Sequence, residues 1–223
     1  MIFRGFLTLS KTILKLKEVS KTYLKGNEEF QALNNITMDF KTKNLSVVVG
    51  HSGSGKSTLL RIAGLLESPS SGFVVFNDTD CTNPTPNERL YLIRNEIGIV
   101  PPQPNLLEYL TVLENVMLPM TQKEKLKAID LLKQVGVEKI TSYPDQVSLE
   151  QQQKVSIARA MINDPQLLLI DEPTTMLSKS STKNVMELIE SLTENLSVIT
   201  FTDNIKLSKF SNKVYKLNNG VSE

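Results

Sequence analysis

One glycine-rich segment constrains this chain more than any other feature of its sequence. Residues 50–57 read Gly-His-Ser-Gly-Ser-Gly-Lys-Ser, which fits the pattern G-x-x-x-x-G-K-[ST]. The residues Leu45–Val49 before it are typical of a buried strand, and the run from Lys56 onward is typical of a helix. A strand, loop and helix in this order turn backbone N–H groups toward a phosphate, and the helix start adds partial positive charge. The segment therefore predicts a loop that binds a nucleoside triphosphate.

Each position of this loop has a predicted role. The Lys56 ammonium is expected to contact the β and γ phosphates, and the Ser57 hydroxyl is suited to ligate Mg²⁺. His51 is the only histidine, but it occupies a variable position of the pattern, so we interpret it as a backbone contributor. A glycine turn with a surface lysine would explain the composition, but not the flanking strand and helix. The predicted nucleotide-binding residues here are Gly50, His51, Ser52, Gly53, Ser54, Gly55, Lys56, Ser57 and Thr58.

A second candidate lies where another apolar run ends. Leu167–Ile170 is followed directly by Asp171 and Glu172. Because side chains alternate along a strand, the two carboxylates are expected to point to different sides and to have different roles. Asp171 is predicted to hold the metal and Glu172 to act as the general base for an attacking water. A pair of solvated charges at a strand end is the alternative, which the apolar run and the glycine-rich loop disfavour.

Short apolar runs elsewhere predict further strands and hence an α/β fold. They are Ile13–Val19, Ile36–Phe40, Phe73–Phe76, Ile97–Val100, Val198–Phe201 and Val214–Leu217. Between residue 101 and about residue 163 the pattern becomes mostly helical. A capping box at Thr111 and Glu114 opens this part, and a helix over Lys123–Val135 is expected to end at Gly136. We therefore predict one domain, with a core of residues 13–100 and 164–223, a helical lobe at about 101–163 and an N-terminal extension at 1–12.

The composition narrows the possible partners and the possible location. The 25 Lys and Arg residues nearly balance the 24 Asp and Glu residues, so a nucleic-acid partner is not expected. The apolar runs are far shorter than the roughly 20 residues needed to cross a bilayer. Cys81 is the only cysteine, which excludes an intrachain disulfide and fits a reducing compartment; we expect a structural thiol.

Further segments, taken in order with the loop and the carboxylates, resemble a known family. They are Ser20–Tyr23, Ala32–Ile36, Gln103, Gln151–Ala160 and Asp171–Thr174. Together they resemble the ATP-binding subunit of ABC transporters, closest to the small stand-alone subunits of the lipoprotein-releasing, macrolide-export and cell-division type. The resemblance covers nearly the whole chain after the extension. It implies a P-loop NTPase core with a mixed sheet, an antiparallel β subdomain and an inserted helical lobe.

The resemblance also implies roles for individual residues. Tyr23 would stack on the adenine ring, with a half-buried strand tyrosine as the alternative. Gln103 would reach Mg²⁺ and the attacking water, with a generic loop glutamine as the alternative. From the opposite subunit of a dimer, Ser148 and Gln151 would complete the nucleotide site, and Thr202 stands where the family has a histidine that contacts the γ-phosphate.

Partners follow from the same resemblance. The part of the lobe around Leu106–Pro119 would face a separate membrane-spanning subunit, which places the chain in the cytoplasm on the inner face of the cell membrane. The cofactors would be ATP and Mg²⁺. The chain would pair as a homodimer, or as a heterodimer with another ATP-binding subunit.

The sequence departs from the family pattern at three places. The signature Leu-Ser-Gly-Gly-Gln is replaced by Val147–Gln151, so that Leu149 and Glu150 stand in place of two glycines. At about 4 Å and an effective dielectric near 20, the Glu150 carboxylate would repel a γ-phosphate by roughly 4 kcal/mol. Leu177-Ser178 replaces a leucine-aspartate pair, and Thr202, which cannot become cationic, replaces the histidine.

Three functions are consistent with these features. The first is an ATPase subunit that drives a membrane partner, with Lys56, Gln103 and Glu172 as its catalytic residues. The second is a binding module that holds Mg·ATP and hydrolyses it slowly or not at all. It would act as the regulatory half of an unequal pair, or as a module outside transport. The third is a small-molecule P-loop kinase, which leaves Gln151–Ala160 unexplained and ranks last. We expect ATP binding with weak hydrolysis by the isolated chain.

Overall fold

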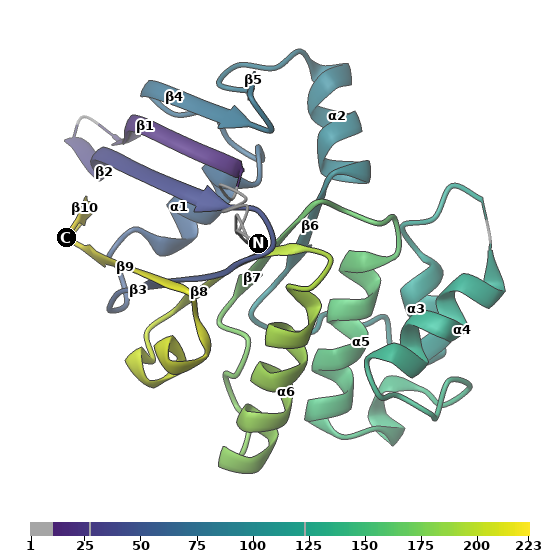
Figure 1. The fold of residues 1–223 in the computed structure, drawn as a ribbon. Coiled ribbons are helices and arrows are strands. Elements are labelled where there is room, and N and C mark those ends of the chain that lie inside the picture. The colour runs from purple at the N-terminus through teal and green to yellow at the C-terminus, as the bar shows by residue number, and fades with distance from the viewer. Residues whose placement is uncertain (1–10, 27, 123) are drawn as a thin grey trace, which may run out of the picture.

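Two β-sheets form the framework of the fold (Figure 1). The computed structural model describes residues 11–26, 28–122 and 124–223. An antiparallel sheet has the order β2-β1-β4-β5, and a larger sheet has the order β10-β9-β3-β8-β7-β6. The antiparallel strands are β1 (Thr12–Lys25), β2 (Glu28–Lys41), β4 (Ser71–Phe76) and β5 (Thr79–Asp80). The other strands are β3 (Leu45–Val49), β6 (Ile97–Val100), β7 (Leu167–Asp171), β8 (Ser197–Thr202), β9 (Lys213–Asn218) and β10 (Val221–Ser222).

The larger sheet is mixed, as predicted. Its strands β9, β3, β8, β7 and β6 are parallel neighbours, whereas β10 pairs with β9 in the antiparallel direction. Parallel strands need crossovers, and these are supplied by helices on both faces of the sheet. The helices are α1 (Lys56–Ala63), α2 (Pro86–Asn95), α3 (Val112–Met117), α4 (Lys125–Gln134), α5 (Leu149–Met161) and α6 (Lys179–Leu192).

Apolar clusters lie on both faces of the mixed sheet. Along β7, Leu167 and Leu169 contribute to the cluster shared with α1 and the antiparallel sheet. Leu168 and Ile170 contribute to the opposite cluster, which contains the buried face of α6. This alternation explains why the strand reads as an uninterrupted apolar run: both of its faces are covered. The sheet is therefore a rigid support for the loops at its strand ends.

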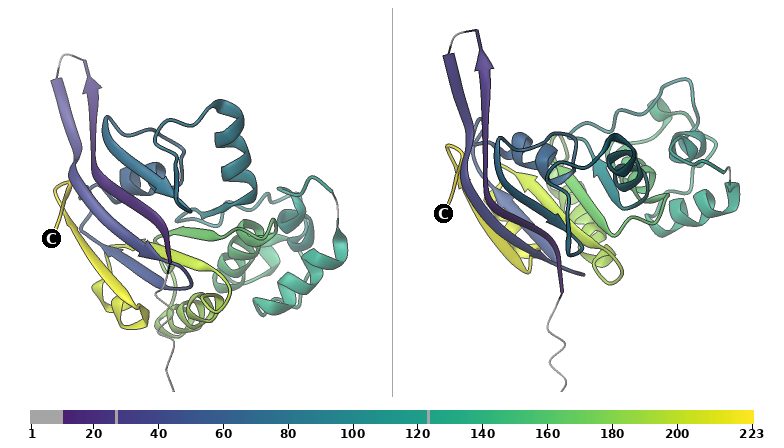
Figure 2. Two further views of the ribbon diagram at one scale, coloured as in Figure 1. Left: turned by 45° about the horizontal axis from the view of Figure 1, so that its top comes forward. Right: turned by 90° about the horizontal axis from the view of Figure 1, so that it is seen from above.

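A helical insertion between β6 and β7 carries α3, α4 and α5. These helices lie together on one side of the molecule, away from the antiparallel strands (Figures 1 and 2). They enclose an apolar cluster of their own. The capping box predicted at the start of α3 is confirmed, because Thr111 Oγ1 accepts from Glu114 N and the Glu114 carboxylate accepts from Thr111 N. Gly136 adopts the predicted left-handed conformation, with φ of 75°.

Some boundaries differ from the predictions. The helix expected over Lys123–Val135 is α4, Lys125–Gln134; residue 123 lies outside the described residues. The predicted extension at 1–12 is also mostly outside them, although Thr12 already belongs to β1. Helix α2 was not predicted, because its sequence lacks a clear apolar stripe and none of its residues is fully buried. Its signal was the box Thr85-Pro86-Asn87-Glu88, which caps the helix. Within the described residues, no helix is long and apolar enough to cross a membrane.

Candidate nucleotide-binding site

The glycine-rich loop connects β3 to α1 and requires glycine at two points. Gly55 precedes α1 with φ of 104°, and a Cβ there would lie 2.7 Å from the Ala32 carbonyl oxygen. A Cβ at Gly50 would collide with Ser54 Oγ and with the Leu217 carbonyl oxygen. These two glycines let the loop fold tightly against β2 and β9, as the sequence pattern predicts.

Lys56 carries a buried positive charge into this loop. Only 7% of the residue is exposed. Its Nζ donates to the carbonyl oxygens of Gly50 at 2.7 Å and His51 at 3.0 Å. The same ammonium lies 3.8 Å from Glu172 Oε1. A desolvated ammonium interacts strongly with anions, so the loop presents a concentrated charge where the sequence predicts phosphates.

A pocket of about 450 Å³ unites the loop with the carboxylates that follow β7. Its size is in the range of pockets that bind small ligands. The lining residues are Phe30, Ala32, Ser52, Gly53, Gly55, Lys56, Ser57, Thr58, Pro102, Asp171, Glu172, Thr175 and Asp203. Eight of the predicted site residues thus contribute to one pocket; they are Ser52, Gly53, Gly55, Lys56, Ser57, Thr58, Asp171 and Glu172.

Hydrogen bonds fix the orientation of the Glu172 carboxylate. Oε2 accepts from Thr202 Oγ1 at 3.0 Å, and Oε1 accepts from Asp203 N at 3.0 Å. Burial raises the pKa of Glu172, and the negative charges of Asp203 and Asp171 add to this, while Thr202 and Lys56 act in the opposite direction. Burial also raises the pKa of Asp171, with Lys56 offsetting part of the effect. A held carboxylate with a raised pKa is suited to accept a proton near neutral pH.

Several predicted residues do not line this pocket. The Tyr23 hydroxyl donates to Glu67 Oε2 at 2.8 Å and accepts from Arg61 at 3.1 Å. Its cross-strand partner Phe30 lines the pocket instead. Sequence reasoning missed Phe30; the signal for it was an aromatic residue on the strand paired with Tyr23. Gln103 is exposed on the loop after β6, and its neighbour Pro102 reaches the pocket.

Two residues of the loop turn away from the pocket. The ring of His51 is hydrogen-bonded to the Ser52 carbonyl oxygen and to Asn218 Oδ1, so its side chain does not line the pocket. Ser54 Oγ is buried without a hydrogen-bond partner among the described residues, and Ser54 N donates to the His51 carbonyl oxygen. The Ser54 side chain is therefore buried inside the turn and does not line the pocket.

Comparisons with known proteins decide the family. The ABC transporter family matches residues 33–175. The chain belongs to the ABC transporter family. An uncharacterized ABC transporter ATP-binding protein of Methanocaldococcus jannaschii, MJ0796, is 35% identical over 95% of both chains. The lipoprotein-releasing system ATP-binding protein LolD of Rickettsia typhi is 37% identical over 96% of this chain and 98% of its own.

Solved structures agree with this assignment. A dimeric structure of the cassette MJ0796 in a post-hydrolysis state, bound to ADP and Pi, matches with a TM-score of 0.84 and 34% identity. It covers 94% of this chain and 97% of the other. The protein is therefore the ATP-binding subunit of an ABC transporter, a class of domains that are generally ATPases. The predicted resemblance and fold are confirmed.

The altered signature of this cassette keeps its helix start. Ser148 caps α5, since its Oγ accepts from Gln151 N at 3.2 Å and Gln151 Oε1 accepts from Ser148 N at 3.2 Å. Neither residue lines the P-loop pocket of its own chain. Ser178, which stands where the family has an aspartate, similarly caps α6 by accepting from Ser181 N. Both substituted segments thus retain local structure.

The expected repulsion by Glu150 needs correction. Its carboxylate lies 3.0 Å from Lys154 Nζ and accepts from Asn184 Nδ2 at 3.1 and 3.3 Å. Only 18% of the Glu150 side chain is exposed. Partial burial acts to raise its pKa, but hydrogen bonds from Ser181, Lys154 and Asn184 outweigh burial and lower it. The charge is present but compensated, so a free-carboxylate repulsion of roughly 4 kcal/mol overstates its effect on a phosphate.

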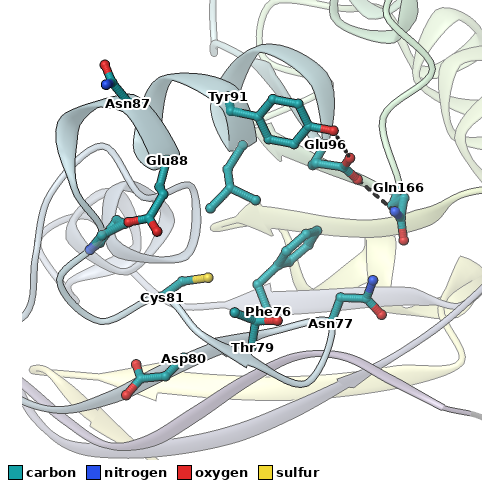
Figure 3. Close-up of a pocket in the computed structure, with 12 residues that line it drawn as sticks. Phe76, Asn77, Thr79, Asp80, Cys81, Asn87, Glu88, Tyr91, Glu96 and Gln166 are labelled. Carbon is teal, nitrogen blue, oxygen red and sulfur yellow. Dashed lines mark hydrogen bonds between the residues drawn. The ribbon is translucent and has the colours of Figure 1, made fainter.

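The only cysteine lies in a different pocket, between the antiparallel sheet and α2 (Figure 3). The sulfur of Cys81 points into this pocket, whose walls include Phe76 and Tyr91. Burial raises the pKa of the thiol, and Asp80 and Glu88 add to this. A thiol held in its protonated form is a poor nucleophile, which fits the expected structural role.

Proposed function

We propose that this cassette binds Mg·ATP in the P-loop pocket, hydrolyses it slowly as an isolated chain, and couples the reaction to a separate membrane-spanning subunit. The observation that carries the proposal is the single pocket that contains Lys56, Ser57, Asp171 and Glu172. A buried ammonium, a hydroxyl and two carboxylates are the groups that phosphoryl transfer to water requires.

The pocket fits a metal-bound nucleotide. Among the described residues, no cluster of three or more His, Cys, Asp or Glu side chains could hold a metal alone. A magnesium ion would therefore depend on phosphate oxygens together with Ser57 and Asp171, which is how Mg²⁺ is usually bound in such sites. Gln103 is proposed as a further ligand that approaches from the loop after β6. Bound Mg²⁺ would neutralise charge on the phosphates.

Glu172 is the proposed general base. Thr202 and the Asp203 amide hold both of its oxygens, so its position is defined before a water is oriented. Thr202 thus positions the base with a neutral hydroxyl. Because a threonine cannot carry positive charge, it cannot stabilise charge on a γ-phosphate as an imidazolium can. This substitution supports slow hydrolysis.

The adenine ring is proposed to lie beside the β1–β2 hairpin. Tyr23 and Phe30 are cross-strand partners, and Phe30 lines the wall of the phosphate pocket. The exposed fraction of Phe30 is 59%, so its face is available to a planar base. Tyr23, with its hydroxyl held by Glu67 and Arg61, would continue this aromatic surface.

We further propose that two cassettes pair, with Ser148 and Gln151 of each completing the other's nucleotide site. The compensated charge of Glu150 leaves pairing with a second copy feasible, as well as pairing with an intact cassette. The second candidate function is a hydrolysis-impaired or regulatory subunit of an unequal pair, or a module outside transport. It is favoured by the substitutions at Leu149, Glu150 and Thr202.

The helical lobe, at about residues 101–163, is the proposed contact with the membrane subunit. The cassette would then sit at the cytoplasmic face of the cell membrane. The test is ATP turnover by the purified chain, alone and with the membrane protein encoded beside it. We expect weak turnover alone and stimulation by the partner. Fast turnover alone would contradict the weak activity, and no ATP binding in either sample would contradict the function itself.

A further inference from the structure

A lysine-lined groove lies beside the segments that follow β7 and β8. It is formed by the segment before α6, the first turns of α6, and the 3₁₀ helix Ile205–Phe210, and it measures about 540 Å³. Its lining residues are Thr174, Leu177, Lys179, Thr182, Lys183, Asn204, Lys206, Leu207, Lys209 and Phe210. Four of these are lysines and none is acidic, so the groove is cationic.

The floor of the groove is apolar. Leu207 is 2% exposed, and Leu177 and Phe210 pack against the same apolar cluster. The Lys209 ammonium lies 4.8 Å from the centre of the Phe210 ring, so cation and ring share one edge of the groove. A cationic rim over an apolar floor suits a ligand with both carboxylates and apolar side chains, which inorganic phosphate lacks.

The lysine charges are poorly compensated within the chain. Lys183 pairs with Glu187, on the next turn of α6, at 3.5 Å. The described residues supply no ion pair to Lys179, Lys206 or Lys209. Lys179 and Lys183 also lie in the first two turns of α6. The first of these turns contains no acidic residue. Cations are unfavourable at the positive end of a helix, so an anionic partner would relieve this repulsion.

A chain of hydrogen bonds joins the groove to the general base. Lys206 N donates to Asn204 Oδ1 at 3.1 Å, and Asn204 N donates to Thr202 Oγ1 at 3.1 Å. Thr202 Oγ1 in turn donates to Glu172 Oε2 at 3.0 Å. A ligand that moves Asn204 would therefore change the hydrogen bond that orients Glu172.

We propose that this groove docks an acidic, partly apolar peptide segment of a partner protein, and that docking changes the rate of ATP hydrolysis. The apolar floor beside the charged rim favours such a segment over a small anion. The proposal goes beyond the proposed function, because docking itself requires no nucleotide.

The first experiment measures binding of a fluorescent peptide of alternating glutamate and leucine to the full chain without nucleotide. The groove variant carries Lys179→Gln, Lys206→Gln and Lys209→Gln. The control variant carries the same change at three exposed lysines elsewhere, Lys17, Lys133 and Lys139. We expect the groove variant to bind about tenfold more weakly, and the control to bind as the wild type does. Equal binding by all three proteins would overturn the site.

Further arms identify the occupant. Peptides with glutamine for glutamate, or serine for leucine, should bind more weakly; equal binding of either would overturn the proposed chemistry. If inorganic phosphate or vesicles containing phosphatidylserine bind as tightly as the peptide through the same lysines, the groove is a small-anion or membrane site. Either result would overturn the proposed peptide. Finally, saturating peptide should change ATP turnover of the wild type but not of the groove variant. An unchanged wild-type rate, in a sample that hydrolyses ATP, would overturn the regulatory claim.

Discussion

The P-loop pocket and the start of α5 serve the same proposed reaction, but they depart from the family pattern to different degrees. In the pocket, the loop, Lys56, Ser57, Asp171 and Glu172 are intact and lie together. At the start of α5, two glycines are replaced by Leu149 and Glu150. Both regions nonetheless keep their local structure, since Ser148 still caps the helix.

This difference predicts that the start of α5 keeps its helix cap while its contribution to anion binding is weakened. Helix capping needs only a side-chain oxygen at Ser148 that accepts from Gln151 N, and a Gln151 side chain that accepts from Ser148 N. Anion binding by glycine-rich backbone needs open space and unopposed N–H groups, which Leu149 and Glu150 restrict. Binding of ATP should therefore depend on the pocket, whereas turnover should depend on both regions.

The largest effect is expected from Glu172→Gln, which tests the pocket. A glutamine cannot accept the proton from water, so turnover should fall by about 10²- to 10⁴-fold while the Kd for Mg·ATP changes little. Burial raises the pKa of Glu172, so this base becomes protonated at a pH above the ordinary pKa of glutamic acid. The wild-type rate should therefore fall at that higher pH when the pH is lowered. Steady-state rates across pH check both points. An unchanged rate in the variant would exclude Glu172 as the base.

Lys56→Ala should abolish most nucleotide binding. The ammonium is buried, and charge-assisted hydrogen bonds to phosphates are worth about 1.5–3 kcal/mol each, so the Kd should rise by at least about 10²-fold. Isothermal titration calorimetry measures the change. The matched control is the exposed Lys133, whose alanine variant should bind ATP as the wild type does. Equal affinity of both variants would contradict the P-loop assignment.

A smaller effect is expected from the aromatic hairpin. Phe30→Ala and Tyr23→Ala should each raise the Kd for Mg·ATP by about tenfold, because stacking on a base contributes about 1–3 kcal/mol. Binding of inorganic triphosphate serves as the control, since it lacks a base and should be unaffected. If triphosphate binding falls equally, the two residues act on the loop and not on adenine.

The smallest effect is expected from Glu150→Gln, which tests the start of α5. Its pKa is lowered in the folded state, so the ionised group stabilises the fold above the ordinary pKa of glutamic acid, and this contribution is lost as pH falls. The variant should be about 1 kcal/mol less stable at neutral pH, with the difference shrinking in acid. Urea denaturation at several pH values measures it. Glu187→Gln, in an exposed pair with Lys183, is the control and should change stability little. Equal losses would argue against the anchoring of Glu150.

The sequence predicted the parts of the site that depend on backbone pattern. β3 and the start of α1 lie where the apolar run and the loop placed them, because a buried parallel strand and a glycine turn leave strong local signals. The cap at Thr111 was predicted for the same reason. The roles of individual residues in binding remain predictions, because they depend on the nucleotide.

Contacts between distant segments could not be predicted. Phe30 reaches the pocket through strand pairing, and Glu150 finds Asn184 only because α5 and α6 pack together. Charge alone suggested that Glu150 would oppose a phosphate. Lys154, on the next turn of the same helix, offsets its charge, and Asn184 on α6, 34 residues away in sequence, donates to its carboxylate. Likewise, no residue of α2 is fully buried, and only Leu92 and Ile93 pack against the core, so its capping signal had little apolar pattern to support it.

The most direct test measures ATP affinity and ATP turnover on the same preparation of the full chain. It compares the wild type with a variant carrying Leu149→Gly, Glu150→Gly and Thr202→His. If the P-loop, Asp171 and Glu172 suffice for binding, and the substitutions at the start of α5 and at Thr202 limit hydrolysis, both proteins bind Mg·ATP equally well, and the variant hydrolyses it markedly faster. Fast hydrolysis by the wild type, or an unchanged rate in a folded variant, would contradict this account.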